Sequence, residues 1–240
     1  MQRFVTFAVL AVFAAFASSC AQSEPQPEAE AAPAAAADQL DATVVDPDHY
    51  KVEFENDRVR IVRITYGVGE TSVMHSHPDH VAVFLTPLKG EFIMPDGTTE
   101  QVDVAAGSHM FVPAGQHHPR NTGTEAFEAV AIEVKSATPA GEAGPDATVV
   151  DANHYKVEFE NDRVRIVRVT YGPGEESVMH YHPDHAGVFL TDQRLEFRLP
   201  DGTTQEITGA RGGHIFAPAG QHQPKNIADT PMEGVLVEVK

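Results

Sequence analysis

The sequence predicts an all-β protein built from two similar barrels that follow one another along the chain. Short apolar segments alternate with turns rich in Gly, Pro, Asn and Asp, a pattern typical of β-sandwiches and barrels. Beyond the first twenty residues, no segment keeps a helical period for more than a turn or two. Residues 41–135 also return, without a gap, as residues 146–240. Because each copy has the length of a small domain, we expect a duplicated domain and not a solenoid.

The first twenty residues resemble the leader of a bacterial lipoprotein. Arg3 precedes an apolar run that ends in small residues, which predicts a signal peptide over residues 1–19. Cys20 is the one cysteine, and it follows Ala17 in a segment similar to a lipoprotein cleavage box. We therefore expect a protein of the bacterial cell envelope, either lipid-anchored or secreted to the periplasm.

Two segments have compositions that cannot form a core. Residues 20–40 are rich in Ala, Pro and Glu and contain almost no large apolar side chains, which predicts a disordered, semi-extended tether. Residues 136–145 are small and turn-rich and are expected to link the two copies. The two domains are accordingly predicted at residues 41–135 and 146–240.

The charge balance narrows the range of partners. The chain has 35 Asp and Glu residues against 17 Lys and Arg residues, a net charge of −18. Such a chain has no long-range attraction for nucleic acid or for anionic membrane surfaces. We therefore expect a small-molecule ligand or substrate, no nucleic acid, and membrane contact only through the N-terminal lipid anchor.

Within the first copy, the predicted strands follow one another closely. Residues 50–66 alternate apolar and charged side chains around an Asn-Asp turn, which places the arginines of this segment on a solvated face. Residues 80–86 form a continuous apolar strand. Residues 91–104 predict two strands around an Asp-Gly turn, residues 107–112 a strand before a Pro/Gly turn, and residues 127–135 a closing strand.

Closely spaced histidines recur in both copies. On a strand, side chains two residues apart share a face, so His75 and His77 point the same way, as do His180 and His182. Two adjacent imidazoles form half of a metal site, since imidazole suits Zn, Cu, Fe and Ni.

Two motifs around these histidines resemble those of the cupin superfamily. The first is G-x5-H-x-H beginning at Gly69, and the second is G-x5-P-x-G followed by H-x3-N, beginning at Gly107; both recur in the second copy. The resemblance implies two tandem jelly-roll barrels of the double-stranded β-helix type, each holding a divalent transition metal: Fe, Mn, Zn, Ni or Cu. It implies six metal ligands: His75, His77, His117, His180, His182 and His222.

The sequence departs from the cupin pattern at the fourth ligand. Cupins usually have a Glu four or five residues after H-x-H. Here those positions are Val81 and Ala82 in the first copy and Ala186 and Gly187 in the second, none of which can bind a metal.

Three interpretations stay open. Each site could use three histidines and leave one position for water or an anionic substrate, as in the thiol dioxygenases among the cupins. Alternatively, His80 and His185 replace the missing Glu. In the third interpretation no metal binds, and the histidines line a polar pocket.

The other histidines have weaker signals. Strand parity allows His109 and His214 to face inward and orient a metal ligand, although a partly exposed structural role fits equally well. His49 and His154 precede the first strand of each copy, where we expect solvated turn residues.

Two functions from different classes are compatible with these features. The first is a metal-dependent cupin enzyme of the dioxygenase, isomerase or decarboxylase type that acts on a small polar metabolite. The second is a non-catalytic periplasmic lipoprotein that binds a small ligand or a metal. The open position favours the enzyme, and the tether and missing Glu favour the binding protein.

Overall fold

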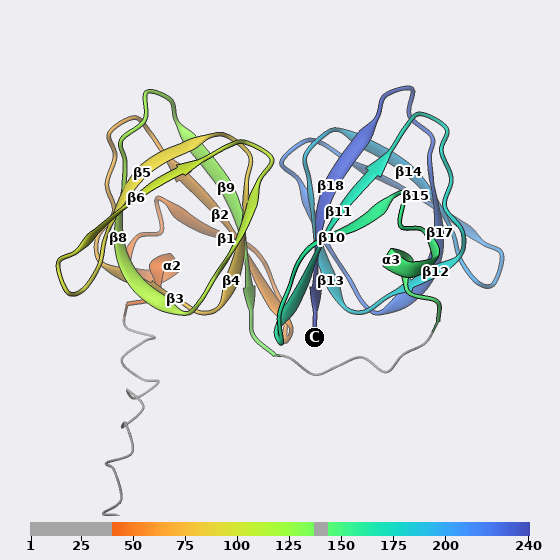
Figure 1. Ribbon diagram of the computed structural model, residues 1–240, viewed down its shortest axis with the longest axis horizontal. Coiled ribbons are helices and arrows are strands. Elements are labelled where there is room, and N and C mark those ends of the chain that lie inside the picture. Colours follow the sequence, from red (N-terminus) through yellow and green to blue (C-terminus); the bar gives the residue numbers. More distant parts are fainter. Residues whose placement is uncertain (1–39, 137–143) are drawn as a thin grey trace, which may run out of the picture. The chain divides into compact units, whose positions relative to one another are not determined.

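The computed structural model describes residues 40–136 and 144–240, in which each copy forms two antiparallel sheets (Figure 1). The predicted signal peptide, Cys20 and nearly all of the tether lie outside these residues, as does most of the predicted linker. Within the part of the chain that the structure describes, no helix is long and apolar enough to cross a membrane.

The elements of the two copies correspond one to one. The first copy contains α2 (Ala42–Val45), β1 (Tyr50–Glu55), β2 (Val59–Tyr66), β3 (His75–His77), β4 (His80–Phe84), β5 (Leu88–Ile93), β6 (Thr99–Val104), β7 (His109–Val112), β8 (Gly115–Asn121) and β9 (Phe127–Val134). The second contains α3 (Ala147–Val150), β10 (Tyr155–Glu160), β11 (Val164–Tyr171), β12 (His180–His182), β13 (His185–Phe189), β14 (Gln193–Arg198), β15 (Thr204–Gly209), β16 (His214–Ala217), β17 (Gly220–Asn226) and β18 (Met232–Val239).

Each copy pairs a five-stranded sheet with a four-stranded one. The first copy has the orders β1-β2-β9-β4-β7 and β3-β8-β5-β6, and the second has β10-β11-β18-β13-β16 and β12-β17-β14-β15. Strands that are distant in the sequence become neighbours, as in a jelly roll. This confirms the predicted all-β class and the two tandem barrels.

Local sequence explains the ends of the elements. Asp41 caps α2, because its side chain accepts a hydrogen bond from the Thr43 backbone N–H at 2.9 Å. Gly97 has a φ of 84° in the turn between β5 and β6, a conformation that favours glycine over residues with a side chain. The predicted Asp-Gly turn is therefore confirmed.

The five-stranded sheets are covered on both faces. Inside the first barrel, one apolar cluster includes Ile64, Phe84 and Phe127. On the opposite face of the same strands, a second cluster combines residues of both copies, including Ile61 and Ile166. Both copies belong to one compact unit. The cover on both faces explains why every residue of β4 is buried and why the strand is apolar after His80.

Candidate metal centre

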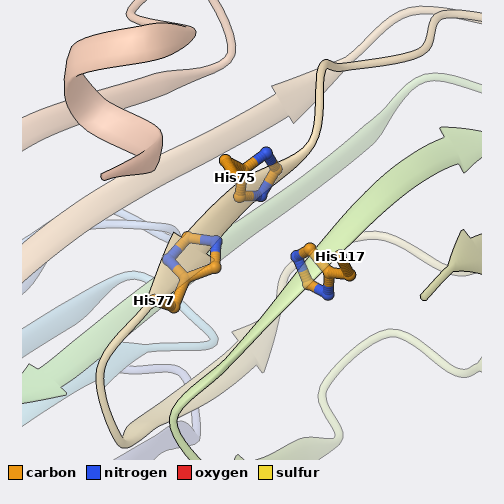
Figure 2. A group of neighbouring side chains, drawn as sticks. All are labelled: His75, His77 and His117. Carbon is orange, nitrogen blue, oxygen red and sulfur yellow. The ribbon is translucent and has the colours of Figure 1, made fainter. Parts of the chain in front are cut away.

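Three histidines meet inside the first barrel, on two neighbouring strands (Figure 2). His75 and His77 share one face of β3, and β8 brings His117 directly opposite His75. Their ring centroids lie 4.8–5.4 Å apart. The second barrel repeats the arrangement with His180, His182 and His222. In each triad, one nitrogen from every ring lies within 4.8 Å of the others.

A backbone contact fixes the tautomer of the first histidine in each triad. His75 Nδ1 lies 2.9 Å from the carbonyl oxygen of Val73, which can only accept a hydrogen bond. Nδ1 therefore carries the proton, and Nε2 keeps a free lone pair. His180 repeats this contact, with 2.8 Å between its Nδ1 and the carbonyl oxygen of Val178. His75 and His180 are thus held in the form that binds a metal through Nε2.

The Nε2 atoms fit a metal because nothing else satisfies them. Four buried Nε2 atoms lack a hydrogen-bond partner among the described residues: those of His75, His117, His180 and His182. A buried polar nitrogen without a partner is destabilising, and it calls for an explanation such as a missing ion. Three imidazoles that converge on one point supply the donor set that transition metals prefer.

Burial favours the neutral form of His75 and His117. Burial, and after it the neighbouring His77, lower the pKa of His75 to about 4, against the opposing effects of the Val73 carbonyl and Asp46. The pKa of His117 lies well below its usual range, first because of burial and then because three other histidines surround it. Neutral imidazole is the state that binds a metal, so each site is prepared for a cation.

A buried carboxylate anchors the second histidine of each triad. His77 Nδ1 lies 3.2 Å from Glu133 Oε1, and Glu133 is 1% exposed. Burial alone would raise the pKa of Glu133, but hydrogen bonds from His77 and Arg60 and the charge of Arg60 outweigh it and hold the pKa low. Glu133 is thus anionic, and a carboxylate on Nδ1 orients a metal-binding histidine and makes it more basic.

The contacts that hold Glu133 extend through Arg60 to Asp41, at the start of the domain. Arg60 contacts Glu133 through Nε, and its Nη2 lies 2.7 Å from Asp41 Oδ2. Because its side chain is only 15% exposed, the prediction that Arg60 belongs to a solvated strand face is wrong. The second barrel has the same series of contacts through Asp146, Arg165, Glu238 and His182.

A tyrosine pair packs against the triad. The Tyr50 ring lies 4.6 Å from that of His75 and 5.1 Å from that of His77, and Tyr66 Oη donates to Tyr50 Oη at 2.8 Å. Behind this pair, the His49 ring stacks on Tyr66 at 4.2 Å. The expectation of a solvated turn residue at His49, and at its equivalent His154, is therefore wrong: each ring packs on a tyrosine and pairs with an aspartate.

His80 and His185 lie beside the triads but outside them. His80 is buried, its ring centroid is 5.0 Å from that of His77, and its Nδ1 donates to the carbonyl oxygen of Pro78 at 2.9 Å. The same contact, at 2.8 Å, holds His185. Neither joins the sets of nitrogens that lie within 4.8 Å of one another. A role for them as additional ligands stays a prediction.

The structure places His109 and His214 at contacts between the two copies. His109 Nε2 lies 2.9 Å from Glu158 Oε2, and His214 Nε2 lies 3.1 Å from Glu53 Oε2. Among the described residues, neither ring forms a hydrogen bond with a triad histidine. The expectation that they orient a metal ligand is not met, because the sheet face that carries them packs against the other copy.

A cavity adjoins each triad at the position of the missing Glu. The cavity of the first barrel measures about 70 Å³, and its lining includes His77, His80, His117 and Ala82. The cavity of the second barrel measures about 60 Å³ and has Gly187 at the position of Ala82. One water needs roughly 10–15 Å³ by this measure, so each cavity has room for a small ligand.

A wider opening leads to the first site. It measures about 620 Å³ and is lined by segments of β6, β7 and β8, together with His77, His80 and His117. His77, His80 and His117 thus line both the inner cavity and this opening.

No family model matches the sequence, and no curated protein matches it. Solved structures do match. AerE from Microcystis aeruginosa aligns with 80% of this chain and 97% of its own, at 14% identity and a TM-score of 0.55. Bacillus subtilis oxalate decarboxylase, a protein with Mn(II) centres, aligns with 76% of this chain and 69% of its own, at 14% identity and a TM-score of 0.53.

A cupin domain from Bordetella pertussis aligns over 42% of this chain and 99% of its own, at 28% identity and a TM-score of 0.35. Together with the sheet orders, the two-barrel matches show that this chain has the bicupin fold, with two tandem cupin barrels and a histidine triad in each.

The sequence patterns did not predict that Glu133 and Arg60 support the triad. Glu133 lies in an apolar strand, where an acidic residue between buried neighbours is the one signal of a special role. Its partner Arg60 has no such signal, because it alternates with apolar residues as a solvated residue would. The contact between Glu133 and His77 joins positions 56 residues apart, a separation that no local pattern specifies.

Proposed function

We propose that each barrel binds one divalent transition metal ion through the Nε2 atoms of its three histidines, and that the loaded protein is a metal-dependent cupin enzyme acting on a small polar metabolite. The metal is Fe, Mn, Zn, Ni or Cu. The observation that carries the proposal is the convergence of three imidazoles in both barrels, in which four buried Nε2 atoms have no partner among the described residues.

The residues of the chain have distinct roles in this proposal. The triads hold the ion, Glu133 and Glu238 orient His77 and His182, and the apolar cavity walls exclude bulk water. When bound, the metal supplies Lewis acidity that polarises an oxygen-bearing substrate. Ala82 and Gly187 leave open the position where cupins usually have a fourth ligand, and an open position is typical of catalytic metal sites.

The reaction type is proposed as dioxygenation, isomerisation or decarboxylation, the chemistries that cupin barrels support. A three-histidine site carries more positive charge than one with an added Glu, which favours an anionic or bidentate substrate. We place the protein in the bacterial cell envelope, held by a lipid on Cys20 or secreted to the periplasm. That part of the proposal is supported by the sequence of residues 1–40.

Metal analysis of protein purified without an affinity tag tests the metal sites. We expect about one equivalent per barrel, since each triad is complete. His75→Ala and His117→Ala should each remove the metal of the first barrel and leave that of the second. His118→Ala is the matched control, because the His118 side chain contacts Thr71 at the surface. Less than about a tenth of an equivalent per barrel would refute the metal sites.

Turnover assays then separate an enzyme from a binding protein. Protein loaded with iron or manganese is tested with small carboxylic acids and thiols, and oxygen uptake and product formation are recorded. The double variant His117→Ala with His222→Ala, which keeps both anchoring glutamates, is the negative control. Tight metal binding without turnover beyond that control would favour the non-catalytic lipoprotein.

A further inference from the structure

The cavities of the two barrels differ at several wall residues, and one of these differences replaces an apolar side chain with an amide. Leu88 begins β5 and lines the first cavity, and its counterpart Gln193 begins β14 and lines the second. Both residues are buried, with 4% and 6% of their surface exposed. The two copies therefore place an apolar side chain and an amide at the same point of the cavity wall.

The Gln193 amide has no partner in the protein. Its side chain makes no hydrogen bond to any residue that the structure describes. The amide is not among the fully enclosed polar groups without a partner, so its hydrogen-bonding atoms reach the cavity that Gln193 lines. Because this amide faces a cavity, a ligand inside that cavity is the partner that the geometry allows.

A neighbouring residue has changed together with Gln193. The first barrel has Ala129 on β9, and the second has Gly234 at the same place on β18. A Cβ on Gly234 would lie 3.4 Å from Gln193 Nε2 and 3.2 Å from the Val188 carbonyl oxygen. The missing methyl group leaves space beside the amide. Gly234 thus lies directly beside the Gln193 amide in the second cavity.

The lining of the second cavity indicates what kind of group the amide would bind. Among the described residues that line it, none is a lysine, arginine, aspartate or glutamate. A charged group at this wall would have no counter-ion, whereas an amide both donates and accepts hydrogen bonds. A neutral hydroxyl or carbonyl satisfies it in either role.

From these observations we infer that the two barrels select different ligands. Gln193 makes the second cavity specific for a small molecule that places a neutral hydroxyl or carbonyl group at this wall. Leu88 makes the first cavity specific for a small molecule that places an apolar group there. The inference rests on the proposed function in one respect, namely that a metal holds the other end of the ligand.

Two matched probes test this selectivity: butyrate, and 4-hydroxybutyrate, which adds one hydroxyl at the far end from the carboxylate. Each barrel is studied alone in the full chain, by removing the other triad with His75→Ala plus His117→Ala or with His180→Ala plus His222→Ala. Binding to Co²⁺-loaded protein is followed by the visible spectrum of the metal.

We expect the second barrel to prefer 4-hydroxybutyrate over butyrate by about tenfold, the value of one buried hydrogen bond. Gln193→Leu should remove this preference. Conversely, Leu88→Gln with Ala129→Gly should create it in the first barrel. If Gln193→Leu binds cobalt and both probes but keeps the wild-type preference, the inference is wrong while the proposed metal site stands.

The thermal stability of the metal-free protein tests the inference about Gln193 independently of the proposed metal sites. If the amide is unpaired, Gln193→Met, which keeps the shape and removes the polar group, should raise the Tm of the metal-free protein by about 2–4 °C. Leu88→Met is the matched control in the first barrel and should leave the Tm unchanged. A lower Tm for Gln193→Met would mean that the protein itself pairs the amide, which overturns the inference whether or not the triads bind a metal.

Discussion

The two barrels share their metal-binding parts residue for residue but differ in the cavity walls. In both, a backbone carbonyl holds the first histidine and a buried glutamate holds the second. The wall positions Ala82, Leu88 and Ala129 become Gly187, Gln193 and Gly234. The residues that would hold a metal are therefore the same in both barrels, whereas residues that would contact a ligand differ between them.

The largest expected effect is one that both barrels should share, the loss of stability in mild acid. Burial lowers the pKa of four histidines from 6.5 to about 4, namely His75, His80, His180 and His185. The unfolded chain then binds more protons than the folded protein between these two pH values. Stability is therefore complete above pH 6.5 and falls as the pH drops through the window towards 4.

Urea denaturation of the metal-free protein between pH 7.5 and pH 4 measures this loss. One pKa unit corresponds to about 1.4 kcal/mol, so each of the four histidines contributes on the order of 2–3 kcal/mol near the lower limit. Loss confined to pH values below 4 would point to carboxylates instead. Replacing His80 by Gln should flatten the curve, and His118→Gln, at the surface, should leave it as it is.

The next effect tests whether the anchors of the two barrels are equivalent. Arg60→Met leaves Glu133 buried without its cation, and Arg165→Met does the same to Glu238. Breaking a buried ion pair from one side typically costs about 3–5 kcal/mol of unfolding free energy. Equal losses in urea denaturation would confirm that both anchors work alike.

The control for this pair is Arg194→Met. Its ion pair with Glu206 is exposed on both sides, so its removal should leave stability unchanged. If Arg60→Met behaves like Arg194→Met, the contact between Arg60 and Glu133 contributes nothing to the folded state, and the carboxylate must be satisfied in another way.

The sequence predicted the parts of the site that depend on local spacing. His75 and His77 are two residues apart on one strand, and the resemblance to cupins supplied His117. The contacts that the sequence could not predict join distant strands, as Glu133 does with His77. A charged residue such as Arg60 has the same alternation with apolar neighbours whether it faces solvent or a buried carboxylate, so periodicity cannot separate the two cases.

His109 shows the same limit for strand parity. Parity assigns it to one face of β7, but both faces of this sheet are covered, one by the barrel interior and the other by the second copy. Whether His109 faces the barrel interior or the other copy depends on how the two copies pack. The sequence of a single copy carries no information on this packing. Gln193 had a signal only in the comparison of the copies, where it replaces a leucine.

A third prediction concerns metal affinity and should distinguish the barrels. The hydrogen bond from His182 to Glu238 is 2.7 Å long, and that from His77 to Glu133 is 3.2 Å. Removing a carboxylate behind a metal-binding histidine typically weakens metal binding by about 10–100-fold. We expect Glu238→Gln to weaken its site more than Glu133→Gln does, because the shorter contact orients its histidine more strongly.

Competition with a chelator, followed by metal analysis, measures this difference. Glu128→Gln and Glu233→Gln are the controls: they lie on the same strands as the anchors, and their partners are Arg63 and Arg168. If Glu133→Gln and Glu238→Gln retain metal as well as these controls do, the carboxylates stabilise the fold alone and not the metal sites.

The smallest expected effect lies at the position of the missing fourth ligand. A Cβ on Gly187 would lie 3.0 Å from Leu236 Cδ2 and 3.2 Å from Ile215 Cγ1, so Gly187→Ala crowds two apolar side chains. We expect a loss of about 1 kcal/mol, since overpacking of a tight core costs at least this much. Ala82→Gly removes one methyl group and loosens its strand, for a similar loss of about 0.5–1 kcal/mol.

The value of this pair is that both changes leave the histidines and their anchors in place. Chemical denaturation gives the two stability losses, and metal analysis of the same samples should still find about one equivalent per barrel. Loss of metal from Gly187→Ala would mean that the wall helps to hold the ion, contrary to the separation between metal-holding and ligand-facing parts. Retention of metal with altered probe binding would instead assign this position to ligand selection, beside Gln193.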